Sequence, residues 1–199
     1  MKEDKTEQRW DKLLHIRTSG RDDSHSDQYR YPYEPTPYTV LERLANSGYI
    51  RKNNVLLDYG CGKGRGDFFL SYQTRCKSIG IEYDDRIYAA AMNNASKAAS
   101  SGRVQFVHQD ATQYTVGMEV DRCYFFNPFS VEILQKVIAR IMESYYEKPR
   151  GIQLFFYYPS DEYISYLMAV DELIFLDEIN CADLFQGENK RERIMIFEV

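Results

Sequence analysis

Long apolar runs, paired cysteines and an excess of basic residues are all missing from this chain of 199 residues. No apolar run approaches the roughly 20 residues of a membrane-spanning helix, and no signal-peptide core follows the polar N-terminus. We therefore expect a cytoplasmic protein without a membrane partner. The formal net charge of −5 argues against broad electrostatic binding to nucleic acid, which depends on many Lys and Arg contacts with phosphates. A local basic groove stays compatible with this charge.

Metal-ligating side chains are few and scattered. The four cysteines and three histidines form no C-x-x-C pair and no Cys-His cluster. Neither a disulfide framework nor a zinc site is therefore expected, and we predict no metal cofactor. The composition, with 44% hydrophobic and 28% charged residues, is that of an ordinary globular domain, and the length suits one α/β unit.

A polar segment, residues 1–34, precedes the main domain, which we place at 35–199. Residues 1–30 contain seven basic and seven acidic side chains, a balance that does not describe a basic nucleic-acid arm. Trp10, Leu13 and Leu14 have helical spacing and predict a short amphipathic helix. The prolines at 32, 35 and 37 predict an extended stretch, with Thr36 as the N-cap of a following helix and Pro37 in its first turn.

From residue 53 onward, strand and helix patterns alternate. This alternation predicts a three-layer α/β sandwich whose seven-stranded sheet is mostly parallel, with one antiparallel edge strand. Ligands of such sheets bind beyond the carboxyl ends of the strands, so the site is expected there. Strands are expected near 55–57, 78–81, 104–107, 121–126, 152–158, 173–179 and 193–199, and helices near 65–75, 84–100, 131–141 and 160–168.

Residues 56–66 carry the most specific pattern in the chain, Leu-Leu-Asp-Tyr-Gly-Cys-Gly-Lys-Gly-Arg-Gly. An apolar strand ends at Asp58 and leads through a glycine-rich turn into a helix, whose N-terminal N–H groups can face a carboxylate or phosphate. A dinucleotide fingerprint, G-x-G-x-x-G, would need glycine where the chain has Arg65 or Asp67, which disfavours an NAD-dependent oxidoreductase. A turn that serves only strand-to-helix geometry is the simpler alternative.

The order D-x-G-x-G-x-G instead resembles the first motif of class I, Rossmann-like S-adenosylmethionine-dependent methyltransferases. The chain is similar to small bacterial proteins of this class over about residues 35–160, which implies a Rossmann-like fold and S-adenosyl-L-methionine as cofactor. The resemblance implies that Asp58 reaches the ammonium group of the cofactor. A charge at the end of a buried strand needs some partner in any case. The turn residues that the resemblance places against the methionine part are Gly60, Cys61, Gly62 and Gly64.

Two further positions match the cofactor site of the same class. Glu82 ends the second strand, where a carboxylate would accept hydrogen bonds from both ribose hydroxyls, and its neighbour Tyr83 is included in the site. Asp110 and Ala111 follow the third strand, where an acidic side chain receives the adenine amino group and the next backbone N–H meets a ring nitrogen. The simpler alternatives are a solvated strand end for Glu82 and a turn cap for Asp110.

Asn127, Pro128 and Phe129 end the fourth strand and resemble the catalytic motif of amino-group methyltransferases, which reads Asn or Asp, Pro-Pro and an aromatic residue. There the Asn side chain and the following backbone carbonyl hold the nucleophilic nitrogen, so we assign these three as catalytic residues. The single proline makes nucleic acid a less favoured acceptor than an amine of a protein or small molecule. A strand-ending turn in which Asn127 or Ser130 caps the next helix is the alternative.

Hydroxyl and aromatic side chains gather near the expected mouth of the site. We assign Thr36 and Tyr38 to cofactor binding, because a hydroxyl from either could hold the cofactor carboxylate, and Tyr31 and Tyr33 could cover the same end. Packing of these side chains onto the core is the alternative. Alternation along the strands requires about half of the aromatics near 124–129 and 155–158 to face the core. The expected wall residues at the end of the fifth strand are Tyr157, Tyr158 and Pro159.

These patterns together predict a methyltransferase with an unidentified acceptor, in which a nitrogen of a protein or small molecule is favoured. Methyl transfer from a sulfonium is an in-line displacement, for which the protein mainly supplies alignment and desolvation. No His or Cys is placed as an obvious base or nucleophile. The alternative is a non-catalytic protein that binds S-adenosylmethionine as a sensor or partner surface, and nucleic-acid N-methylation is less favoured.

Overall fold

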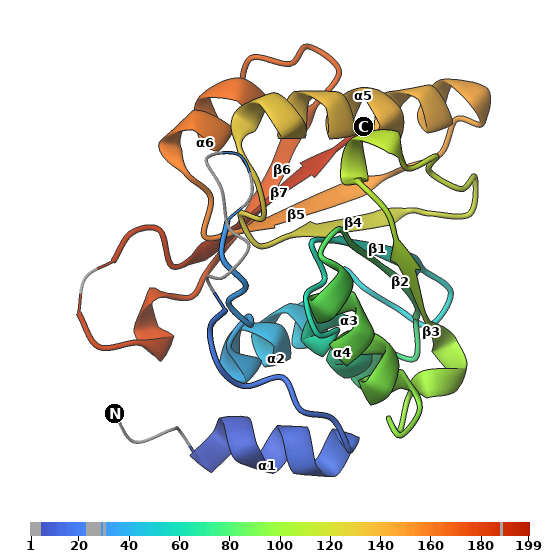
Figure 1. Ribbon diagram of the computed structural model, residues 1–199. Helices are drawn as coiled ribbons and strands as arrows, with labels where there is room; N and C mark the ends of the chain where they lie inside the picture. Colours follow the sequence, from blue (N-terminus) through green and yellow to red (C-terminus); the bar gives the residue numbers. More distant parts are fainter. Residues whose placement is uncertain (1–4, 23–28, 30, 188) are drawn as a thin grey trace.

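The computed structural model describes residues 5–22, 29, 31–187 and 189–199; the parts of the predicted N-terminal segment at 1–4, 23–28 and 30 lie outside the described residues. A seven-stranded sheet forms the centre of the molecule, with helices on both of its faces (Figure 1). The strands lie in the order β3-β2-β1-β4-β5-β7-β6. Their bounds are β1 Val55–Tyr59, β2 Lys77–Glu82, β3 Val104–His108, β4 Arg122–Phe125, β5 Gln153–Tyr157, β6 Ile174–Asn180 and β7 Arg193–Glu198.

The first five strands are parallel, and β7 runs antiparallel to both of its neighbours, β5 and β6. This confirms the predicted Rossmann-like sandwich with a mostly parallel sheet. The antiparallel strand lies one position inside the edge, which β6 forms. Residues 181–192 join β6 to β7, and their described part holds a short 3-10 helix, Ala182–Leu184, and no α-helix. Without a helical crossover the two strands pair antiparallel.

The helices form two layers that cover opposite faces of the sheet. One face carries α5 (Val131–Glu147) and α6 (Asp161–Leu167), and the other carries α2 (Tyr38–Asn46), α3 (Arg65–Thr74) and α4 (Asp85–Ala95) (Figure 1). Successive residues of β1 point to opposite faces, so Leu56 belongs to the core under α2 and α3, whereas Leu57 belongs to the core under α5. Both side chains are fully buried, as expected for a parallel strand covered on both sides.

Helix bounds differ from the sequence predictions at three places, one of which is the end of α5, which continues to Glu147 rather than ending near residue 141. Helix α2 starts after Pro37, which occupies the N-cap position, so the prediction that Thr36 caps this helix is wrong. The Thr36 hydroxyl instead lies 3.0 Å from the hydroxyl of Tyr124. Helix α4 ends at Ala95 rather than near residue 100. Just before this end, the buried side chain of Asn94 bonds the backbone of Arg17 and Lys63.

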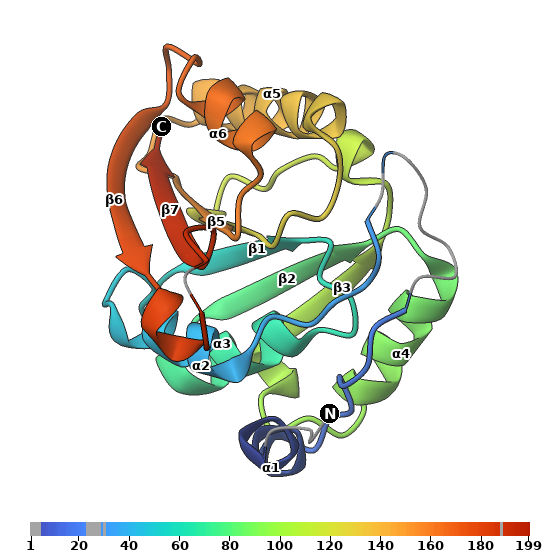
Figure 2. The same cartoon turned by 90° about the vertical axis from the view of Figure 1, so that its left-hand side faces the viewer.

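The N-terminal segment packs onto the face that carries α2 and α3. Helix α1 (Lys5–Leu14) carries Trp10, whose indole N–H donates to Glu42 at 2.8 Å and whose ring meets Phe69 edge-on at 4.9 Å. Past α1 the chain crosses the end of the sheet toward the start of α5 before it enters α2 (Figure 2). There the amide of Tyr31 donates to the carbonyl of Pro128 at 3.2 Å. The described part of this segment thus contacts α2 and α3 through Trp10 and the turn before α5 through Tyr31.

Candidate functional site

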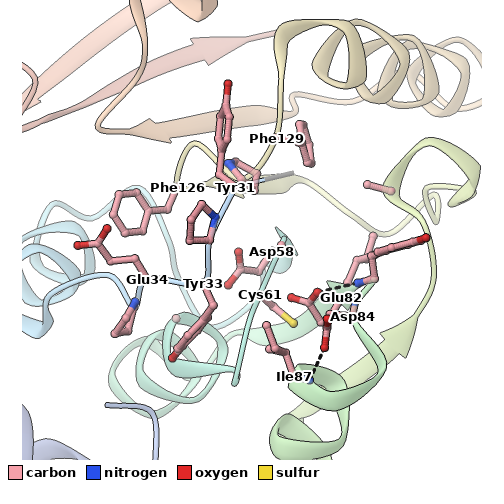
Figure 3. Close-up of a pocket in the computed structure, with 18 of the residues that line it drawn as sticks. Tyr31, Tyr33, Glu34, Asp58, Cys61, Glu82, Asp84, Ile87, Phe126 and Phe129 are labelled. Atoms are coloured by element: carbon pink, nitrogen blue, oxygen red, sulfur yellow. Dashed lines mark hydrogen bonds between the residues drawn. The ribbon is translucent and has the colours of Figure 1, made fainter. Parts of the chain in front are cut away.

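A cavity of about 540 Å³ opens at the carboxyl ends of the parallel strands. Its walls come from the turns that follow β1 to β4 and from the extended segment before α2, as the topology rule for open α/β sheets predicts. Figure 3 shows Asp58 and Cys61 on one wall, Glu82 and Asp84 at one end, and Phe126 at the opposite end. The cavity takes residues from the segments 31–36, 58–66, 81–87, 108–111, 124–129 and 133.

The glycine turn is shaped by the protein's own side chains. Gly60 has a φ of 72°, and a Cβ on it would lie 2.6 Å from the Cβ of Pro128. Gly62 has a φ of 59°, and a Cβ on it would overlap the ring of Tyr33. Gly60 and Cys61 line the cavity, whereas Gly62 and Gly64 are buried against protein side chains. Close backbone approach is therefore needed here for packing against the protein's own side chains.

Glu82 at the end of β2 is fixed by three backbone N–H groups. One carboxylate oxygen accepts from Tyr83 at 2.8 Å and Asp84 at 2.9 Å, and the other accepts from Gly62 at 3.0 Å. Burial raises the pKa of Glu82, and these hydrogen bonds oppose the shift. Each carboxylate oxygen has two lone pairs, so this arrangement orients Glu82 without exhausting its capacity to accept from a ligand. Tyr83 itself is exposed at the rim of the cavity.

Asp58 lies against a second buried acid, Asp67 of α3. Asp58 is 5% exposed and Asp67 is fully buried, and the Ser78 hydroxyl donates to Asp67 at 2.6 Å. Burial and the neighbouring Asp67 charge raise the pKa of Asp58 well above its ordinary value, and burial raises the pKa of Asp67 to about 7. Because the second oxygen of Asp67 has no other donor among the described residues, a proton shared with Asp58 accounts for the pair.

Asp110 and Ala111 line the cavity beyond β3, in agreement with their predicted position. Asp110 also caps a short 3-10 helix, since it accepts from the backbone N–H and hydroxyl of Thr112 at 2.9 and 2.7 Å. Asp110 therefore both lines the cavity and forms the turn cap that was the simpler alternative from the sequence. His108, which the sequence did not single out, adds its ring to this wall and stacks on Tyr88 at 5.0 Å.

Thr36 and Tyr38, both assigned to cofactor binding from the sequence, occupy different environments in the structure. Thr36 is buried and lines the cavity. Tyr38 is fully buried on α2, and its hydroxyl donates to Asp11 at 2.6 Å; it does not line the cavity. Tyr31 and Tyr33 both border the cavity (Figure 3), and the Tyr33 hydroxyl donates to the carbonyl of Thr18 at 2.6 Å.

Arg65 is a further candidate for the lining of the site. In the sequence it stands out only because it occupies a position where a dinucleotide-binding motif would need glycine. It is 3% exposed, lines the cavity, and lies over the Tyr38 ring at 4.4 Å. Its guanidinium bonds the hydroxyl of Thr18 at 2.7 Å and the carboxylate of Glu7. Glu7 and Asp11 are spaced i, i+4, so they lie on one face of α1, and both lie beside Arg65. In the sequence, this pair of acidic residues on one helix face is a signal that a buried cation packs against α1.

Asn127, Pro128 and Phe129 turn the chain from β4 into α5. Asn127 adopts a left-handed φ of 41°, and its buried Oδ1 atom has no hydrogen-bond partner among the described residues. Pro128 and Phe129 line the first cavity, whereas Asn127 lines a second cavity of about 380 Å³ next to it. Ser130 occupies the N-cap position of α5, although no cap hydrogen bond from its side chain is formed.

The second cavity also receives residues from the end of β5. Tyr157 and Tyr158 line it, as predicted, whereas Pro159 is buried behind them and contributes a carbonyl that accepts from Arg191 at 3.2 Å. The side chains that line both cavities are Tyr31, Pro32, Glu34 and Phe126.

Within residues 5–22, 29, 31–187 and 189–199, no group of three or more His, Cys, Asp or Glu side chains could hold a metal ion. All four cysteines are free and buried. No described helix is long and apolar enough to cross a membrane.

Comparison with solved structures defines the fold class. A glycopeptide N-methyltransferase bound to S-adenosylmethionine matches with a TM-score of 0.62 at 11% identity, over 80% of this chain and 86% of that one. An RNA methyltransferase from Salinibacter ruber bound to S-adenosyl-L-homocysteine matches with a TM-score of 0.54 at 18% identity, over 83% of this chain and 92% of that one. The chain has the Rossmann-like fold of S-adenosylmethionine-dependent methyltransferases. At these identities the likeness establishes the fold.

Sequence comparison adds one curated relative of this methyltransferase fold. A protein-lysine N-methyltransferase of Saccharolobus islandicus (strain REY15A) is 30% identical over 82 residues. The matched part covers 38% of this chain and 48% of that protein, so the chain spans about half the length of the curated relative it matches. No family model matches the chain.

Proposed function

We propose that the protein is an S-adenosylmethionine-dependent methyltransferase that methylates a nitrogen atom. The observation that carries this proposal is the alignment of Asp58, Glu82 and Asp110 along one cavity, at the ends of three adjacent parallel strands. In this order they offer acidic partners to an ammonium group, a ribose and an adenine. The fold shared with methyltransferases that bind S-adenosylmethionine or its demethylated product supports the same cofactor here.

The residues present fit this cofactor. Glu82 is held by three backbone N–H groups, which leaves one of its four carboxylate lone pairs for a ribose hydroxyl. A buried carboxyl group such as that of Asp58 is stabilised by a cationic partner such as the ammonium group of the cofactor. Ala111 offers a backbone N–H beside Asp110. When bound, the cofactor supplies a methyl group on a positively charged sulfur, which is a good leaving group.

The chain's own residues would align the acceptor and exclude water. Phe129 is 5% exposed, and its carbonyl accepts from the Tyr163 hydroxyl at 2.6 Å, which fixes the turn that presents Asn127. The carbonyl of Pro128 accepts one hydrogen bond from Tyr31 and has a second lone pair for an acceptor N–H. The protein-lysine specificity of the curated relative favours an amine of a protein as the acceptor. The solved neighbours include both a glycopeptide N-methyltransferase and an RNA methyltransferase, so they do not distinguish between acceptors.

One observation favours a second candidate, a non-catalytic protein that binds S-adenosylmethionine. The segment before α2 lines the cavity, and its Tyr31 amide already donates to the Pro128 carbonyl, which we assign to the acceptor. A protein that binds the cofactor without methylating an acceptor could keep the hydrogen bond between Tyr31 and Pro128 permanently, because no acceptor has to reach that carbonyl. The two candidates differ in turnover and agree in cofactor binding.

Calorimetric titration with S-adenosylmethionine and S-adenosylhomocysteine tests the cofactor. We expect binding of both, and no heat at millimolar ligand would overturn the proposal. Affinity for NAD without affinity for S-adenosylmethionine would instead favour an oxidoreductase. Transfer of a labelled methyl group to cell extract divided into protein, RNA and small metabolites then separates the two candidates. We expect label in the protein or metabolite fraction, whereas no label in any fraction would favour the non-catalytic protein.

A further inference from the structure

The second cavity, of about 380 Å³, lies beside the cofactor cavity. The two share side chains of the segment before α2, among them Glu34, and they share Phe126. Figure 3 shows Glu34 and Phe126 close together, at the end of the cofactor cavity away from Glu82. A ligand in the second cavity would therefore approach the first cavity from the end opposite to the ribose-binding position.

Aromatic rings form much of the wall of this second cavity. Phe126 and Tyr157 lie with ring centroids 4.7 Å apart, and Tyr157 and Tyr158 lie 6.1 Å apart. The guanidinium of Arg191 already lies over the Tyr158 ring at 4.4 Å. Aromatic faces attract cations, so the rings of Phe126 and Tyr157 favour a cationic ligand with an apolar stem.

The charges of the cavity point the same way. Glu192 accepts a hydrogen bond from the Tyr157 hydroxyl at 2.6 Å, and no ion pair to Glu192 is found in the part of the chain that the structure describes. Burial raises the pKa of Tyr157, so its hydroxyl stays neutral and orients Glu192 without cancelling the charge. Arg191 is committed to carbonyls of the turn after β5, and Arg21 lies 3.9 Å from Glu34. Glu192 is thus a carboxylate held in a fixed orientation without a neighbouring cation to neutralise it, and a cationic ligand would supply that partner.

Asn127 supplies an acceptor for the N–H groups of such a ligand. Its Oδ1 atom is shielded from solvent and lacks a hydrogen-bond donor among the described residues, which is costly unless a ligand provides one. Asn127 and Tyr158 both adopt left-handed backbone conformations, with φ of 41° and 52°, at the ends of adjacent strands. Such strain clusters at binding and catalytic sites, and here both strained residues line one cavity.

We propose that the second cavity is the acceptor pocket and that it binds a primary amine on an alkyl chain, as in a lysine side chain. The amine binds in its protonated form and loses one proton to water before its nitrogen lone pair attacks the methyl group, which leaves the cofactor sulfur as a neutral thioether. The alkyl part would lie against Phe126 and Tyr157, the charge near Glu192, and an N–H at Oδ1 of Asn127. This inference rests on the proposed methyltransferase function, because it names the substrate class of the same site.

The experiment uses the full chain, labelled with ¹⁵N and saturated with S-adenosylhomocysteine, and titrates it with n-butylamine, the fragment that matches a lysine side chain. The neutral isostere 1-butanol is the matched ligand control. We expect the amine to shift the backbone signals of Asn127, Tyr158 and Glu192, and 1-butanol to bind at least roughly tenfold more weakly. Glu192→Gln should weaken amine binding by roughly tenfold.

Glu178→Gln is the matched protein control, since Glu178 also accepts from a single side chain, that of Arg193, but lies outside both cavities. It should leave amine binding unchanged. The proposal is overturned if 1-butanol binds as tightly as the amine, if Glu192→Gln has no effect, or if no signal of the second cavity moves at saturating amine. Failure of S-adenosylhomocysteine to bind at the first step would instead refute the proposed function itself.

Discussion

Asp58 of β1 and Asp67 of α3 are neighbouring buried carboxyl groups, and their raised pKa values favour a proton shared between them. Burial is the main cause of the raised pKa of both groups, and the charge of Asp67 adds to the shift of Asp58. In the unfolded chain, both groups would titrate near their ordinary values of about 4. The folded protein therefore holds a proton between about pH 4 and pH 7 that the unfolded chain has lost.

The free energy of unfolding should consequently fall as the pH rises from about 4 to about 7. A raised carboxyl pKa gives stability that is fully present below the unfolded pKa and is lost as the pH passes the folded pKa. One proton contributes a slope of up to about 1.4 kcal/mol per pH unit. Asp67→Asn, which can still accept from Ser78, should flatten this slope in urea unfolding measured at several pH values. Asp161→Asn, on an exposed helix start, is the control; an unchanged slope in Asp67→Asn would refute the shared proton.

Substitution of Asp11 should lower the free energy of unfolding more than substitution of any other described residue in the N-terminal segment. Its carboxylate accepts from the hydroxyl of Tyr38 at 2.6 Å and from the backbone and hydroxyl of Thr18 at 2.8 and 2.6 Å. Asp11→Ala leaves these buried donors and the cation of Arg65 with fewer partners, and should cost about 2–4 kcal/mol in urea unfolding. Asp183→Ala, which breaks an exposed pair with Arg43, should change stability little. Equal effects of the two variants would contradict the buried network.

Gly62→Ala should destabilise the protein for two separable reasons. The left-handed backbone costs about 1–2 kcal/mol with a side chain present, and the added methyl group overlaps Tyr33. Gly20→Ala is a matched control, because Gly20 has a φ of 90° and no atom within 4 Å of an added Cβ. We expect Gly62→Ala to exceed Gly20→Ala in urea unfolding, and the double variant with Tyr33→Ala to be less destabilised than the sum of its single changes. Additive effects would show that Tyr33 does not need this glycine.

Glu82→Gln should weaken S-adenosylmethionine binding on the order of tenfold, because a neutral amide replaces the charged acceptor of the ribose hydroxyls. Calorimetry at fixed pH measures this change. Glu42→Gln, on α2 and outside the cavity, is the matched control and should keep the native affinity. Unchanged affinity in Glu82→Gln would remove Glu82 from the cofactor site.

Asn127→Ala should leave cofactor affinity unchanged and lower turnover by on the order of 100-fold, since it removes an alignment contact rather than a cofactor contact. Labelled methyl transfer to the best fraction of cell extract measures turnover, and calorimetry measures affinity. Asn93→Ala, on the exposed face of α4, is the control. Full turnover in Asn127→Ala would show that the side chain does not position the acceptor.

Local patterns in the sequence were sufficient to predict the sheet and several residues that line the first cavity. The alternation of apolar strands and amphipathic helices predicts the order of elements, and Glu82 and Asp110 follow from strand ends because parallel strands end at one edge. The sequence could not show that Arg65 binds Glu7, or that Tyr38 turns away from the cavity toward Asp11, because these contacts join residues far apart in the chain. Division into two cavities depends on how the segment before α2 crosses the sheet, which no local pattern encodes.

The docking of α1 gives the protein a built-in optical reporter. Trp10 is the single tryptophan of the chain, and its ring lies between α1 and the Phe69 side of the core. Selective excitation of tryptophan therefore reads the attachment of the N-terminal helix alone, whereas far-ultraviolet circular dichroism reads the whole fold. If the two signals change at the same urea concentration, helix and sheet unfold as one cooperative unit. An earlier change in emission would reveal a native-like state in which α1 has detached while the sheet persists.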